Sequence, residues 1–273
     1  MSEHEISERC RKTYGPLSVL VIGAGGSGSA IFLNLPYLHQ ALRAWGREGL
    51  HVTLADGDLV SETNCVRQPF AAADIGQNKA TVLVNRVNLF WRLNWHAFPS
   101  HFRKDSLKDH GSCPQLVISC VDTRAAREII AEAVARPRCQ VAYWLDLGNN
   151  AASGQYVLGQ PLNYCNRRTR WRLRTVVELY PEIASPEIGE DPLPSCSAVE
   201  ALERQEPYIN QVLATSALAM LARLLRNGSI AHHGGFYNAA TGRMSAIPID
   251  PVLWKKTRMR SLRLLKSRSL QAA

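Results

Sequence analysis

The chain has 273 residues, which is long enough to bury a sizeable core as one large domain or as a domain with an appendage. No apolar run approaches the length of a membrane helix, and the charged N-terminus MSEHEISERCRKTYG is unlike a secretory signal, so we expect a cytoplasmic protein. The net charge is +9, yet seven Lys and Arg lie in the last twenty residues, which hold no acid and leave only +2 for the rest.

The cysteines point to a reducing compartment. Seven of them, an odd number, are scattered along the chain, and no two form a C-x-x-C pair. This pattern is unlike a disulfide framework and unlike a structural zinc site, so no zinc is expected.

The first half of the chain alternates between strand and helix patterns. LSVLVI (17–22) is a continuous apolar run, as in a strand buried on both faces, and GAGGSGSA follows it. Helical spacing then extends to Gln40, with Pro36 expected to kink or shorten the helix. The further predictions, in chain order, are a strand at 51–56, a helix from 76 to 91, strands at 94–99 and 115–120, a helix at 123–136 and a fifth strand at 139–148. This alternation predicts an α/β fold with a doubly wound, mostly parallel, Rossmann-like sheet.

The pattern changes after Gly148. We expect antiparallel strands at 153–159 and a strand pair within 234–249, preceded by a long helix at 208–228. Residues 160–195 are too long for an ordinary connection and are interpreted as a crossing segment or flap. The expected division is an N-terminal extension at 1–16, a main domain at 17–253 and a basic tail at 254–273. The tail is either a solvated, partly disordered extension or a contact for nucleic acid or an acidic partner.

A glycine-rich loop between the first strand and helix favours phosphate binding. The glycines are Gly23, Gly25, Gly26 and Gly28, and their missing Cβ atoms let the backbone approach a phosphate at the helix N-terminus. The string also fits G-x-G-x-x-G, the dinucleotide fingerprint. Asp56, after the second strand, would bond ribose hydroxyls in either case, so an NAD-dependent dehydrogenase and an ATP-binding protein both stay open.

The stretch DGDLVSETNCVRQPF (56–70) favours a triphosphate, which needs cations beyond the loop. Arg67 offers a planar fork for phosphate oxygens, and Lys79, near the next helix start, offers a point charge. Asp122 follows the fourth strand and would face the same crevice, where an acid near a triphosphate is best explained as a magnesium ligand.

The ordered set GAGGSGS, DGDLVSETNCVRQ, GQNKA and CVDT resembles the ThiF, MoeB and ubiquitin-activating enzyme superfamily, over roughly residues 17–225. Members of that superfamily bind Mg-ATP and adenylate the C-terminal carboxylate of a ubiquitin-like protein, so the resemblance implies ATP, Mg²⁺, such a partner and a homodimer. The main domain would then be a ThiF-type adenylation domain.

The resemblance also implies residue roles. Asp56 would hold the ribose, with Asp58 counted among the nucleotide-binding residues. Asn64, Arg67 and Lys79 would contact phosphates. Asp122 would hold magnesium, and with Arg127 it matches the family's D-N-x-x-x-R, with Thr123 in place of Asn. Zinc-bearing relatives carry two C-x-x-C pairs, and only Cys165 lies near the first, which again predicts no zinc.

The later segments LPSCSAVEALERQEPYINQ and NAATGRMSAIPI look like the ThiF-related member of the PRTRC cassette of bacterial mobile elements. Cys196, before a predicted helix start, is a candidate for accepting the acyl group as a thioester, with a structural role as the alternative. A rival interpretation is a non-catalytic, nucleotide-dependent assembly module that contacts DNA or a partition protein.

Overall fold

The computed structural model describes residues 2–11, 15–109, 113–150, 152–169, 171–188, 206 and 208–272. The strands are β1 (His4–Glu5), β2 (Leu17–Ile22), β3 (Leu50–Ala55), β4 (His96–Phe98), β5 (Leu116–Ser119), β6 (Tyr143–Asn149), β7 (Ser153–Gly159), β8 (Ser229–Ile230), β9 (His232–Asn238) and β10 (Arg243–Pro248). The α-helices are α1 (Glu8–Arg11), α2 (Gly26–Ala44), α3 (Lys79–Trp91), α4 (Ser106–Asp109), α5 (Arg124–Val134), α6 (Val176–Leu179), α8 (Ile209–Asn227) and α9 (Pro251–Ala272). The short 3₁₀ helices are η1 (Glu62–Val66), η2 (Ala72–Asp74), η3 (Pro181–Ala184) and η4 (Pro186–Ile188).

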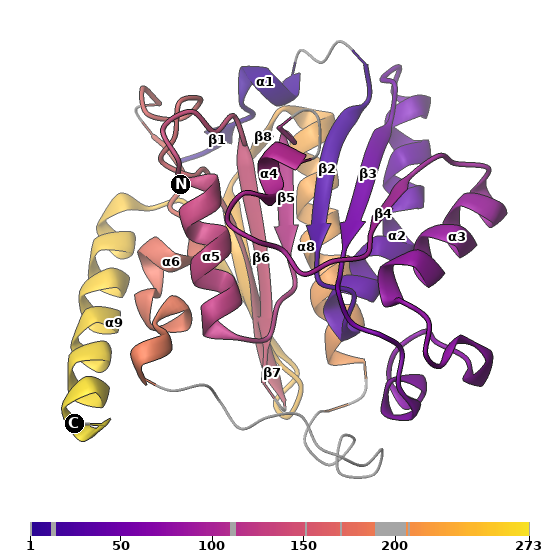
Figure 1. The fold of residues 1–273 in the computed structure, drawn as a ribbon. Coiled ribbons are helices and arrows are strands. Elements are labelled where there is room, and N and C mark those ends of the chain that lie inside the picture. The colour runs from indigo at the N-terminus through magenta and orange to yellow at the C-terminus, as the bar shows by residue number, and fades with distance from the viewer. Residues whose placement is uncertain are drawn as a thin grey trace.

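A sheet of eight strands in the order β10-β9-β7-β6-β5-β2-β3-β4 forms the centre of the molecule (Figure 1). The strands from β6 to β4 pair in parallel, and β7, β9 and β10 join the other side antiparallel. The predicted fold class, a doubly wound and mostly parallel sheet with antiparallel strands after the fifth one, is therefore confirmed.

Helices cover both faces of this sheet. Helices α2 and α8 pack on each other and α3 packs beside α2 on one face, whereas α5, α6 and α9 lie together on the other (Figure 1). Strands β2, β5 and β6 are buried along nearly their whole length, as their continuous apolar runs predict. Among the described residues, no helix combines the length and apolarity needed to cross a bilayer.

The register aligns the carboxyl ends of three central strands. Ile22 of β2 pairs with Ala55 of β3 on one side and with Ser119 of β5 on the other. The segments that leave these strands therefore start side by side, at the edge to which all three arrows point in Figure 1. In a doubly wound sheet this is the edge where ligands bind.

Helix α2 is longer than predicted. It was expected to end near Gln40 with Pro36 shortening it, but it continues through Pro36 to Ala44. Proline removes one backbone donor from the helix. Leu35 and Leu42 on the same helix are fully buried, and this packing offsets the cost of the missing hydrogen bond.

The described part of the predicted crossing segment contains short helices. The described part of 160–195 holds α6, η3 and η4, and β9 and β10 form the antiparallel pair predicted within 234–249. The described N-terminal residues are tied to the main body, because β1 pairs with β8 and the Arg47 guanidinium donates to the Cys10 carbonyl.

The basic tail is not a disordered extension in the residues described. Helix α9 runs from Pro251 to Ala272 and packs on α6, η3 and η4. Trp254, expected at the start of the tail, is 6% exposed and stacks edge-on against His233. The buried residues of this helix, Trp254 and Ser261, lie on the side that packs on the body. Of the two interpretations of the tail, the partly disordered extension therefore does not describe these residues, and the partner contact stays a prediction.

Candidate nucleotide site at the carboxyl ends of the central strands

The glycine loop between β2 and α2 is shaped by close backbone contacts. Gly23 has a φ of +94°, and a Cβ there would lie 2.7 Å from the Cys120 carbonyl oxygen. A Cβ on Gly28 would lie 1.8 Å from the Gly23 carbonyl oxygen, so neither position accepts a side chain. Gly25 has no heavy atom within 4 Å of a built Cβ, and it precedes α2 without a side-chain cap. The loop thus leaves open space in front of the positive end of the α2 dipole.

Asp56 is hydrogen-bonded to this loop. Its Oδ2 accepts from the backbone N–H of Ala24 at 2.5 Å, and its Oδ1 accepts from the N–H of Asp58 at 2.7 Å. Burial raises the pKa of Asp56, and the two N–H donors act against that rise. Each carboxylate oxygen has a second lone pair, so the ribose contact expected of Asp56 is compatible with both hydrogen bonds.

Lys79 and Asp58 form an ion pair at the same edge. The Lys79 Nζ lies 3.0 Å from Asp58 Oδ2, and Lys79 is 7% exposed although it carries a charge. Asn78 caps α3 by accepting from the Thr81 N–H and donates its own Nδ2 to the Asp56 carbonyl oxygen at 2.8 Å. Lys79 is the first residue of α3, in agreement with its predicted place near a helix start, and it lies beside Asp58. Its contact with phosphates stays a prediction.

His101 is a neighbour that sequence reasoning missed. Its Nε2 lies 3.9 Å from Asp58 Oδ1, and a Cβ on Gly57 would lie 2.6 Å from its ring. His101 follows β4, the strand next to β3, and only the sheet order brings it to this place.

Asn64 lies in η1, and Arg67 is the residue that follows this helix. The Asn64 Oδ1 accepts from the Ser61 N–H at 3.0 Å, so at least part of its amide holds the turn itself. The segment before η1 is bonded to the segment before α3, since Val60 N–H donates to the Gln77 carbonyl at 2.8 Å. The roles of Asn64 and Arg67 toward phosphates stay predictions.

Asp122 lies just after β5, the strand next to β2. The N–H of Cys120 donates to the Ile22 carbonyl at 2.8 Å, which fixes the start of this turn against the glycine loop. Asp122 is exposed. Its carboxylate is thus free of the core and follows a strand end beside the loop that holds Asp56.

A buried polar network stabilises the turn that follows β5 and contains Asp122. The Arg127 Nε lies 3.1 Å from Asp146 Oδ1, and Asp146 is fully buried. The Arg127 Nη2 also donates to the Val121 carbonyl at 2.8 Å, and Ser119 Oγ donates to Asp146 at 2.6 Å. Burial raises the pKa of Asp146, while Arg127 and Ser119 act to lower it. Arg127 therefore positions the residue directly before Asp122.

Three more polar side chains meet at the first turn of α2. Ser27 Oγ donates to Asn210 Oδ1 at 2.7 Å and lies 3.4 Å from Asn149 Oδ1. A Cβ on Gly26 would lie 2.4 Å from Asn210 Nδ2, so the glycine makes room for this amide. These side chains come from α2, β6 and α8, and no local sequence motif predicts that they contact one another.

Cys196 lies outside the described residues.

The structure brings together the glycine loop, Asp56, Asp58 and Lys79, and it places Asp122 after the adjacent strand. Backbone donors, one buried cation and an exposed carboxylate at one sheet edge make a site suited to a polyphosphate.

Residues 3–169 match the ThiF family, and the chain belongs to that family. No curated protein shows significant sequence similarity to it.

Solved structures share its fold at low identity. PaaA is 16% identical with a TM-score of 0.58, over 85% of this chain and 64% of PaaA. MccB from E. coli, solved with MccA-N7isoASN, is 16% identical with a TM-score of 0.56, over 86% of this chain and 66% of MccB. Another E. coli MccB structure, with AMPCPP and MccA, is 15% identical with a TM-score of 0.57, over 86% of this chain and 65% of MccB. The chain thus matches just under two thirds of each of these relatives.

Proposed function

We propose that this protein is an ATP-dependent adenylating enzyme that activates the C-terminal carboxylate of a ubiquitin-like or small sulfur-carrier-like protein. The observation that carries the proposal is the buried Lys79, held by Asp58 beside the glycine loop. A diphosphate can be bound by loop amides and a helix dipole alone, whereas a triphosphate requires a cation further out. ThiF family membership and the MccB structure with AMPCPP and MccA support the same activity.

In the proposed reaction a carboxylate oxygen of the partner attacks the α-phosphorus of ATP. A bond forms between that oxygen and the α-phosphorus, the bond from the α-phosphorus to the bridging oxygen breaks, and pyrophosphate leaves with that oxygen. The carboxylate is already ionised near neutral pH, so no general base is needed. The protein contributes positioning and charge neutralisation.

Each group has a role in this reaction. The loop amides at the α2 N-terminus bind phosphate oxygens, and Asp56 accepts from the ribose hydroxyls. Lys79 and Arg67 neutralise charge that builds on the departing pyrophosphate.

The donor set also fits a magnesium ion. Within the described ranges, no group of three or more His, Cys, Asp or Glu has the arrangement of an all-protein metal site. Magnesium instead keeps several waters and takes one or two carboxylates together with substrate phosphates. Asp122, exposed after β5, is the residue that would hold it, and the bound ion would neutralise phosphate charge.

The finer assignments rest on resemblance. The segments around Cys196 and in β9 and β10 support placing this chain with the ThiF-related member of the PRTRC cassette, acting in the cytoplasm. A homodimer is part of the same proposal.

ATP–pyrophosphate exchange with each candidate ubiquitin-like protein tests the activity. We expect exchange with one partner that has a free C-terminal tail and none when that tail is blocked. Nucleotide binding without pyrophosphate formation for any partner would favour the assembly module, and stabilisation by NAD but not ATP would favour a dehydrogenase.

A further inference from the structure

Helix α9 is fixed to the body along one side. Asp250 caps its start by accepting from the N–H groups of Val252 and Leu253 at 2.8 and 3.2 Å. The Trp254 Nε1 donates to the Pro248 carbonyl at 3.2 Å, and the buried Ser261 donates its hydroxyl to Glu182 of η3. These contacts fix the rotation of the helix about its axis, so the same side of α9 always faces solvent.

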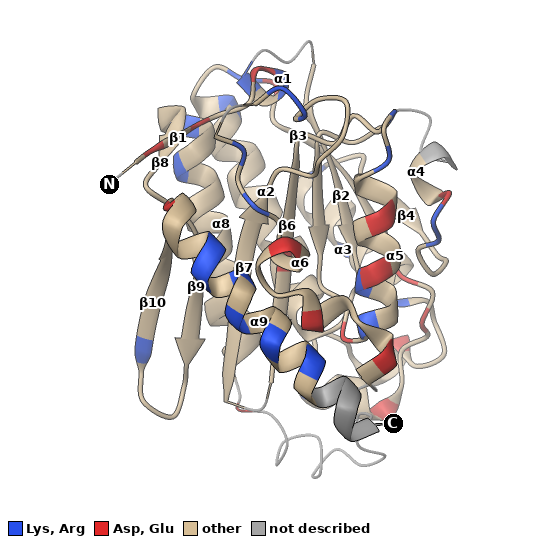
Figure 2. Ribbon diagram, turned by 90° about the vertical axis from the view of Figure 1, so that its left-hand side faces the viewer, with Lys and Arg blue, Asp and Glu red and all other residues tan. Residues whose placement is uncertain are grey.

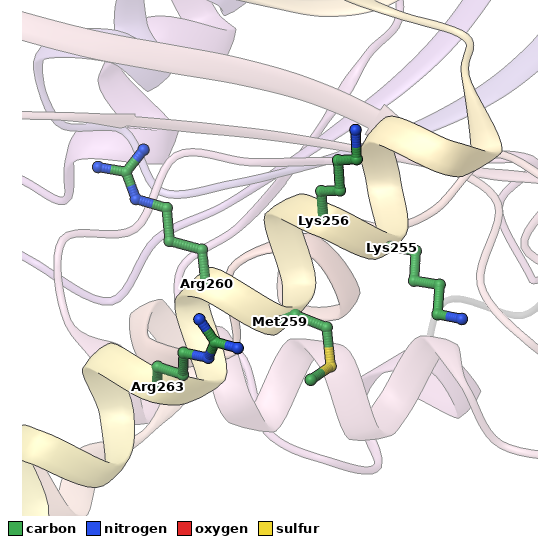
Figure 3. A pocket seen from close by; sticks show the side chains of 5 residues that line it. All are labelled: Lys255, Lys256, Met259, Arg260 and Arg263. Carbon is green, nitrogen blue, oxygen red and sulfur yellow. The ribbon is translucent and has the colours of Figure 1, made fainter.

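That outward face is made of cations. At 3.6 residues per turn, the side chains at 255, 256, 260, 263 and 266 point away from Trp254 and Ser261. These five residues are all exposed: Lys255, Lys256, Arg260, Arg263 and Lys266. Figure 2 shows the basic residues spaced along α9, and Figure 3 shows four of them lining a surface hollow with Met259. We call this set the α9 cationic face.

The fold does not explain this concentration of charge. Helix α9 contains no acid, and none of the five cations makes an ion pair with another residue in the described part of the chain. Lys256 and Arg260 are spaced i, i+4 and Arg260 and Arg263 i, i+3, and like charges at these spacings destabilise a helix. An anionic partner would relieve this repulsion, which supports a binding role for the face.

We propose that the α9 cationic face binds the phosphodiester backbone of nucleic acid. The five cations lie between positions 255 and 266, which are about 17 Å apart along the helix axis, and roughly five phosphates of one DNA strand lie along that distance. The face holds no Asn or Gln, so it contacts the backbone without reading bases through amide side chains.

A membrane surface fits this helix less well. Interfacial helices insert an apolar side between lipids. On α9 the side that carries Trp254 already packs on the protein. The exposed apolar residues of the helix, Val252, Leu253, Met259 and Leu264, are spread among the basic residues and form no continuous apolar side that could insert between lipids.

Fluorescence anisotropy with a short duplex DNA of mixed sequence, measured over a salt series, tests the proposal on the full chain without ATP or partner. The test variant changes Lys256→Gln, Arg260→Gln and Arg263→Gln. The matched control removes the same charge from exposed arginines elsewhere: Arg43→Gln, Arg223→Gln and Arg243→Gln. Thermal unfolding of both variants checks that folding is intact.

The proposal predicts that the α9 variant binds more than ~10-fold more weakly and that its log–log salt slope becomes shallower by about 2.7, three contacts at 0.9 each. The control should keep nearly the wild-type slope. Equal losses in both variants, or wild-type protein that binds anionic vesicles but not nucleic acid, would overturn it. Single-stranded DNA and duplex RNA as further probes show which backbone is preferred. Because ATP–pyrophosphate exchange is measured separately, failure of either proposal leaves the other standing.

Discussion

Lys79 is the residue on which the proposed chemistry depends most. Its ammonium is buried against Asp58, so Lys79→Ala removes the cation that this acid holds near the glycine loop. We expect at least ~100-fold slower adenylate formation, which is about 2.7 kcal/mol of lost transition-state stabilisation, and a similar loss for Arg67→Ala.

Lys104→Ala is the matched control for that change. Lys104 pairs with Glu132 at 2.5 Å on the surface, and both side chains are at least half exposed. Exchange should stay at the wild-type rate in this variant. Wild-type exchange in the Lys79 variant as well would remove Lys79 from the site.

Asp122 is tested through its metal dependence. Asp122→Asn keeps the shape of the side chain but removes its charge, so more magnesium should be needed to reach half-maximal exchange. A magnesium titration that coincides with that of the wild type would exclude Asp122 as the ligand. Because Asp122 is exposed, its substitution should leave thermal stability unchanged.

Cys196 bears on what happens after adenylation. The sequence predicts a helix start after Cys196, and a thiol at such a place would have its pKa lowered and could attack an acyl-adenylate. With Cys196→Ser we expect exchange to persist while any thiol-sensitive conjugate with the partner disappears from non-reducing gels. If the conjugate survives in the Cys196 variant, Cys196 has a structural role. Cys120→Ser, which changes a cysteine at a strand end, is the comparison variant.

At the level of elements, α6 depends on an ionised glutamate. Arg172 donates to Glu178 at 2.8 and 2.6 Å, and the Thr175 N–H donates at 2.9 Å. Burial acts to raise the pKa of Glu178, but these bonds outweigh it and lower the pKa from 4.5 to about 2. The stabilisation is complete above pH 4.5 and is lost as the pH falls toward 2, because the unfolded state takes up the proton first.

Glu178→Gln should therefore lower the free energy of unfolding by roughly 3 kcal/mol at neutral pH. The difference from wild type should shrink as urea unfolding is repeated from pH 7 down to pH 3. Glu187→Gln, at an exposed position in η4, should behave like wild type throughout. If the difference in free energy of unfolding between Glu178→Gln and wild type does not change with pH, the loss of stability comes from packing and not from the charge of Glu178.

The elements themselves were largely predictable because their signals are local. The apolar run of β2 has the predicted bounds, and Asn78 and Thr123 cap α3 and α5 close to the predicted starts. The site contacts that were missed join distant residues: Ser27 and Asn210 are 183 positions apart, and Arg127 and Asp146 are 19 apart. Periodicity and capping rules describe neighbours along the chain, so they cannot pair such residues.

At the level of the whole molecule, α9 joins the C-terminal region to the site. It packs on η3, whose Ile183 carbonyl accepts from Arg127 at 3.3 Å. Deleting residues 254–273 removes the buried Trp254, so we expect a fall in stability of about 3 kcal/mol or more. Nucleotide binding should survive below the melting temperature, because α9 packs mainly on α6, η3 and η4, whereas the glycine loop, Asp56 and Lys79 belong to other segments. Thermal shift with and without ATP measures both effects, and loss of the ATP-dependent shift in a folded truncation would contradict this separation.

Mass spectrometry of the partner after a single turnover shows whether the site transfers an adenylyl group to the partner's carboxylate. With ATP and magnesium, we expect a ubiquitin-like partner to gain the mass of one adenylyl group, which is AMP less one water, at its C-terminal residue. This adduct should form at least ~100-fold more slowly with the Lys79→Ala variant and at the wild-type rate with the Lys104→Ala variant. A partner that binds tightly in the presence of ATP but never carries an adenylyl group, while ATP remains intact, would show that the protein is not an adenylating enzyme for that partner.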